Sequence, residues 1–98
     1  MKRCRHDLVD SAFEEPAGWL ETSIARIAAE VLEADRIGRS DSLFAFDATS
    51  MDALQICARI EAEVGYQVPV HWLFESDTLA DLVSRIEAEA ERRQAGVI

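Results

Sequence analysis

Two neighbouring hydroxyl side chains, Thr49 and Ser50, stand where a long connection meets an apolar periodic segment. Serine and threonine are preferred at helix N-caps because the side-chain oxygen accepts a hydrogen bond from a free backbone N–H of the first turn. Both residues are therefore N-cap candidates. Taken alone, this junction favours capping over a functional role for Ser50, and the rest of the chain must decide between the two.

Other groups that could do chemistry are sparse. Cys57 shares a face with apolar residues, which favours a small buried hydrophobic side chain over a nucleophile. His6 and His71 have no cysteine or histidine at ligand spacing, so we expect no metal site. The four glycines are scattered and form no phosphate-binding loop. Because a chain this small offers little concavity for a two-carboxylate site, we do not expect an autonomous enzyme.

Composition limits the function classes further. The chain has 98 residues, 49% of them hydrophobic and 30% charged, which indicates one globular domain. Its formal net charge of −9 makes nucleic acid and anionic membranes poor partners and favours basic ones. No apolar run is long enough to span a membrane, and the N-terminus is not a secretory signal. Two cysteines form no disulfide framework, which favours a reducing cytoplasm. We also expect a monomer.

The apolar spacing predicts an all-α fold. Stripes at i, i+3, i+4 and i+7 indicate three main helices and one short one, and no segment alternates for long enough to be a strand. Thr78 with Asp81 resembles a capping box, and Arg59 is placed to pair with Glu63 along one helix face. The predicted helices cover 19–34, 50–64, about 70–74 and 79–92.

A long connection, 35–49, separates the first two main helices. Loops of this length in a small domain are usually functional or held by buried anchors. It contains an apolar cluster, Leu43, Phe44 and Phe46, and we expect the two phenylalanines to be those anchors. Basic residues gather at the two ends of the chain, so we predict a flexible leader at 1–17, a domain at 18–92 and a flexible tail at 93–98.

From Trp19 to Ile86 the sequence resembles the acyl carrier and peptidyl carrier proteins. No single motif is specific, but their order and spacing match the family. Thr49 before the serine and the Leu-Phe pair upstream are closer to the peptidyl carrier branch. Asp47 and Ala48 depart from the glycines that are common in the family. The matching stretches are Asp41-Ser-Leu43-Phe44, Phe46-Asp47-Ala48-Thr49-Ser50-Met51, Ala53-Leu54 with Ile56-Cys57-Ala-Arg-Ile60, and Val68-Pro69-Val70 through Leu73-Phe74-Glu75 to Thr78-Leu79-Ala80-Asp81-Leu82.

The resemblance implies a function. A phosphopantetheinyl transferase would move 4′-phosphopantetheine from coenzyme A onto Ser50, and the carrier would shuttle thioester-bound aminoacyl, peptidyl or acyl groups. It implies a non-catalytic protein that meets adenylation, condensation, thioesterase or tailoring enzymes. Thr49, Met51, Asp52 and Leu54 are the candidate partner contacts beside that serine, and Glu61 would add charge.

Alternatives stay open for these residues. Leu54 could pack in the core, Asp52 could complement the helix dipole, and Asp47 could weaken modification. A carrier-like docking subunit that is not modified, or an unrelated acidic helical adaptor, would fit the same features less well. The resemblance implies a nonribosomal peptide or polyketide-type pathway.

Overall fold

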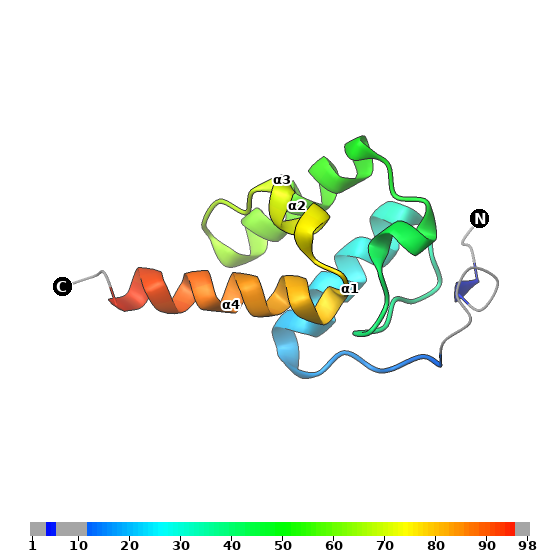
Figure 1. Ribbon diagram of the computed structural model, residues 1–98, viewed down its shortest axis with the longest axis horizontal. Coiled ribbons are helices and arrows are strands. Elements are labelled where there is room, and N and C mark those ends of the chain that lie inside the picture. The colour runs from blue at the N-terminus through cyan, green and yellow to red at the C-terminus, as the bar shows by residue number, and fades with distance from the viewer. Residues whose placement is uncertain (1–3, 6–11, 96–98) are drawn as a thin grey trace.

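The computed structural model describes residues 4–5 and 12–95 of the chain, and its helices form a small bundle (Figure 1). Three main α-helices, a short α-helix and a 3₁₀-helix follow one another, as expected for an all-α carrier-like fold. The described part of the chain contains no strand. In chain order the elements are α1 (Gly18–Leu32), η2 (Leu43–Phe46), α2 (Ser50–Val64), α3 (Val70–Glu75) and α4 (Leu79–Ala95).

Helices α1 and α2 run antiparallel and are joined by ion pairs on their exposed faces. Arg26 Nη2 lies 3.1 Å from Glu63 Oε1, and Arg59 pairs with Glu30. The predicted pair between Arg59 and Glu63 within α2 is therefore wrong, because each of these side chains finds its partner on α1 instead. Helix α4 also packs on α1, and α3 bridges α2 and α4.

The predicted apolar stripes meet in one core. Helix α1 contributes Ile24 and Ile27, and α4 contributes Leu82 and Ile86, all almost fully buried. The C-terminal end of α2 is closed by Gly65, whose φ of 84° lies in the left-handed region where glycine is unstrained. Helix α4 continues to Ala95, past the predicted end at 92.

Of the two phenylalanines expected to anchor the connection between α1 and α2, one does so. Leu43 and Phe46 are buried, with Phe46 completely inaccessible to solvent. Phe44 is not a core anchor, since it is 37% exposed and stacks on Phe74 of α3 at 5.4 Å between ring centroids. The short η2 turn explains the difference, because its three-residue period directs Leu43 and Phe46 inward and Phe44 outward.

Most of the predicted leader, residues 1–3 and 6–11, lies outside the described residues, as do residues 96–98 of the predicted tail. The boundaries at 17/18 and 92/93 stay predictions. The described leader residues contact the connection between α1 and α2, where the Arg39 N–H donates to the Glu14 carbonyl at 2.9 Å. No described helix is both long and apolar enough to cross a bilayer.

Candidate functional site

Ser50 is the first residue of α2, and its neighbour Thr49 is the N-cap. Thr49 Oγ1 accepts a hydrogen bond from the Asp52 N–H at 3.1 Å, and Asp52 Oδ2 accepts one from the Thr49 N–H at 3.0 Å. This reciprocal capping box satisfies two backbone donors of the helix start. The capping role belongs to Thr49, so the exposed Ser50 hydroxyl is not needed for it.

The capping role of Asp52 was missed from the sequence, although the signal is there. Thr-x-x-Asp at 49–52 has the spacing that was recognised at 78–81, where Thr78 Oγ1 accepts a bond from the Asp81 N–H at 3.2 Å. Aspartate in place of the usual glutamate still reaches back to the N-cap N–H of α2. Asp52 therefore orders the helix start and complements its dipole.

Asp47 gives the chain the turn that leads into α2. Its φ of 61° and ψ of 36° lie in the left-handed region, and its N–H donates to the Phe44 carbonyl at 3.2 Å. Aspartate tolerates this conformation better than most residues, which explains how it can stand where the resembling family has glycine. The turn separates buried Phe46 from exposed Ser50, so the hydroxyl is presented to solvent and not sealed against the core.

Exposed apolar side chains begin directly after Ser50 and also lie on the two neighbouring elements. Met51 and Leu54 follow Ser50 on α2 with 64% and 51% of their surfaces exposed. The core-packing alternative for Leu54 is therefore wrong. The stacked rings of Phe44 and Phe74 add apolar surface from the preceding connection and from α3. Exposed apolar groups gathered over neighbouring elements are typical of a protein-interaction surface.

A hollow of about 340 Å³ lies between α2 and the segment before α3, with Leu54 at one side. Cys57 lines it but is 4% exposed, and burial, followed by the nearby Glu61 carboxylate, raises the pKa of its thiol to about 11. The thiol is therefore neutral near pH 7 and inert, as expected. Glu61 Oε1 accepts a bond from the Val68 N–H at 2.9 Å, so this carboxylate holds the loop between α2 and α3.

The site thus combines an exposed hydroxyl, the N-terminal backbone N–H groups of a helix and an apolar surface. Those N–H groups and the positive end of the helix dipole suit an attached phosphate. Within the described ranges, no three histidine, cysteine, aspartate or glutamate side chains gather to hold a metal ion. The geometry fits an acceptor that a second protein modifies.

Comparisons with known proteins point to one family. Residues 22–86 match the family described as "Phosphopantetheine attachment site". Malpinin synthetase of Mortierella alpina is 36% identical over 83 residues, a match that covers 85% of this chain and 1% of the synthetase. The chain therefore spans a small fraction of the length of this curated relative.

Two solved structures share the fold over most of their own length. BlmI, a type-II acyl carrier protein from Streptomyces verticillus involved in bleomycin biosynthesis, is 31% identical with a TM-score of 0.70, covering 72% of this chain and 86% of BlmI. A nonribosomal PCP domain is 28% identical with a TM-score of 0.66, covering 72% of this chain and 91% of that domain.

Proposed function

Because the chain belongs to the phosphopantetheine-attachment family of carrier domains, whose members bear a covalently attached 4′-phosphopantetheine arm, we propose that Ser50 Oγ is the attachment atom here. The observation that carries the proposal is that two different residues cap the start of α2 and expose a hydroxyl there. Thr49 caps the helix through the bond from the Asp52 N–H, and the neighbouring Ser50 is exposed. A visiting transferase can reach such a hydroxyl without unfolding the helix.

The residues around Ser50 fit the arm. Its phosphodiester would face the N-terminal N–H groups of α2, which favour an anion. When attached, the arm ends in a thiol that holds an aminoacyl, peptidyl or acyl group as a thioester. This chain supplies the hydroxyl and the rigid helix start, and a tethered group gains a high effective concentration at each enzyme it meets. The carrier family is non-catalytic, and we assign no bond-making step to this chain.

We place the partner contacts on the exposed surface beside Ser50. Met51 and Leu54 would supply apolar contact to a phosphopantetheinyl transferase and to adenylation, condensation, thioesterase or tailoring enzymes, with Thr49 at the edge of the same surface. Asp52 would attract basic partner surfaces and so act on association rates more than on affinity. These contacts are small and transient because a carrier must leave each enzyme. We infer that the carrier meets these enzymes in the cytoplasm, as a monomer.

Intact-protein mass tests the attachment directly. The full chain is incubated with coenzyme A, Mg²⁺ and a broad-specificity transferase, and we expect a gain of one phosphopantetheine. Ser50→Ala should abolish the gain, whereas Ser84→Ala, which removes an exposed hydroxyl from α4, should leave it intact. No gain with several transferases, or a gain that survives Ser50→Ala, would refute the assignment.

The alternative of a docking subunit that is not modified rested on Asp47 and Ala48. The left-handed backbone of Asp47 supports the modified carrier instead, since aspartate keeps there the turn that glycine would make. The alternative predicts stable co-purification with one enzyme and indifference to Ser50→Ala, so the mass experiment separates the two.

A further inference from the structure

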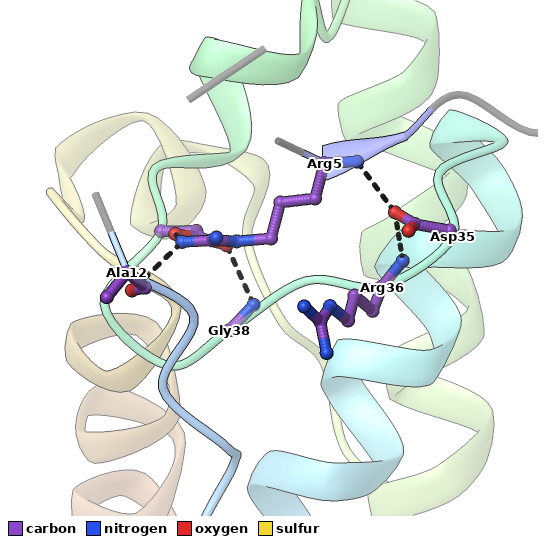
Figure 2. Close-up of polar contacts among 6 residues, drawn as sticks. Arg5, Ala12, Asp35, Arg36 and Gly38 are labelled. Carbon is purple, nitrogen blue, oxygen red and sulfur yellow. Dashed lines mark hydrogen bonds and ion pairs between the residues drawn. The ribbon is translucent and has the colours of Figure 1, made fainter. Parts of the chain in front are cut away.

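Arg5 is buried in spite of its charge. Only 4% of its surface is exposed, and its guanidinium makes a two-pronged contact with Asp41, from Nε to Oδ2 at 2.5 Å and from Nη2 to Oδ1 at 2.6 Å. Nη2 also donates to the Ala12 carbonyl at 3.2 Å, and the Arg5 N–H donates to Asp35 Oδ1 at 2.7 Å. Figure 2 shows the side chain extended between these groups. Paired charge-assisted bonds of this kind are strong and directional.

Asp41 connects Arg5 to the rest of the fold. Its side chain is completely buried, and its Oδ2 also accepts a bond from the Gly38 N–H at 2.8 Å. Its backbone carbonyl accepts a bond from the Leu79 N–H at 3.0 Å, at the start of α4. Removing the cation from a buried carboxylate strongly destabilises the folded state, because it leaves an uncompensated buried charge. Arg5 therefore completes a polar cluster that joins the N-terminal segment, the connection between α1 and α2, and α4.

A second set of contacts holds the same segment through Phe13, whose ring also lies 5.4 Å from the guanidinium carbon of Arg5. The Phe13 ring lies under the guanidinium carbon of Arg36 at 4.0 Å, and Gly38 packs against Phe13 and Glu14. A Cβ at position 38 would lie 2.7 Å from the Glu14 carbonyl oxygen and 3.2 Å from Phe13 Cδ1. Gly38 is not among the residues with positive φ, so its backbone accepts alanine. What requires glycine at this position is the approach of the N-terminal segment.

We propose that residues 4–5 and 12–17, here called the strap, position the connection that presents Ser50, and that Arg5 is the positioning residue that locks the strap through Asp41. The strap lies N-terminal to the stretch 22–86 that matches the family. The locking itself is independent of the proposed function, and only its consequence for Ser50 rests on that function.

The expected consequence follows from the order of the chain. Asp41 lies just ahead of η2, and η2 leads through the turn at Asp47 into Ser50. Without the strap, the connection samples more arrangements, and fewer molecules present the helix start in the form that a transferase binds. A fall in the competent fraction raises the apparent KM by the same factor and leaves the chemical step unchanged.

Residue-resolved amide hydrogen exchange on the full chain tests the locking. The paired variant Arg5→Met with Asp41→Asn removes the ion pair without leaving a buried charge. We expect exchange at the Leu79 and Ala80 amides, both bonded to the connection, to accelerate about 10-fold to 100-fold, the range expected for loss of charge-assisted hydrogen bonds. The matched control Arg26→Met with Glu63→Gln removes an exposed pair and should leave these amides unchanged. Equal exchange in the two paired variants would overturn the proposal.

Gly38→Ala supplies a second route to the same state and keeps the Arg5–Asp41 charges in place. Alone it should accelerate exchange at the same amides, and in the Arg5→Met, Asp41→Asn background it should add little, because the strap is already released. Such non-additivity is the mark of two changes that act through one element. Fully additive effects would overturn the shared mechanism.

Transferase kinetics then test the consequence at Ser50. We expect KM for the carrier to rise with kcat unchanged in the paired variant and in Gly38→Ala. Arg5→Lys keeps the charge but loses the two-pronged contact, so its KM should lie between those of these variants and that of the native chain. An unchanged KM in variants with faster exchange would refute the positioning role. If the native chain is not modified at all, the proposed function fails, while the exchange experiment still decides whether the strap locks.

Discussion

The left-handed turn at Asp47 allows a sharp test of how the helix start is built. A non-glycine residue in this region loses about 1–2 kcal/mol to contact between Cβ and the following carbonyl oxygen. Glycine avoids that contact but adds about 0.5–1 kcal/mol of backbone entropy loss on folding. With φ at 61° and ψ at 36°, we therefore expect Asp47→Gly to be more stable than Asp47→Ala by about 1 kcal/mol.

Thermal and urea unfolding of Asp47→Gly, Asp47→Ala and Asp47→Asn would measure this difference. For a domain of this size, about 1 kcal/mol corresponds to a midpoint difference of about 4–8 °C. Asp47→Asn removes the charge and keeps a side chain suited to the left-handed region, so it should remain close to the native chain. Equal stability of the glycine and alanine variants, or a more stable alanine variant, would contradict the turn geometry and with it the account of how Ser50 is presented.

Three further outcomes follow from the structure. Thr49→Ala should lower the free energy of unfolding by about 1 kcal/mol in urea titrations, because the capping box is lost, and an unchanged value would contradict the cap. The hydrogen bond from Arg39 lowers the pKa of Glu21, so this carboxylate stabilises the fold above its unfolded pKa and loses that effect as pH falls through its folded pKa. Glu21→Gln should therefore flatten the acid limb of a curve of unfolding free energy against pH. An unchanged acid limb would contradict the stabilising role of Glu21. At pH 8 a thiol reagent should label exposed Cys4 quickly and buried Cys57 only on unfolding, and equal rates would contradict the pKa of about 11 for Cys57.

The helices and the position of Ser50 could be predicted because they depend on local pattern. Apolar residues with a helical period define which face is buried, and Gly65 ends α2 where the pattern ends. The predicted range 50–64 for the second helix is confirmed by Ser50–Val64. Exposure of Leu54 could not be decided in the same way, since a leucine near a helix start suits either a core or an interface.

Contacts between distant segments could not be predicted. Arg5 and Asp41 are 36 residues apart, and an arginine in a basic cluster near a chain end has the sequence signature of a solvated tail. The sequence predicted that Arg59 pairs with Glu63 at i+4. Its ion pair is instead with Glu30 on α1, because the antiparallel packing brings that carboxylate close. The prediction that Phe44 is a buried anchor was wrong because the apolar cluster gave no sign that a 3₁₀ turn would direct its ring outward.

Fusing this carrier domain into an engineered multidomain enzyme requires a choice of domain boundary. A cut guided by the matched stretch would fall at residue 22 and would discard the arginine that neutralises Asp41. The fused domain would then contain the Asp41 carboxylate without its cation, in the connection that leads to Ser50. Fusion junctions placed ahead of Arg5 avoid that defect, whichever module is joined upstream.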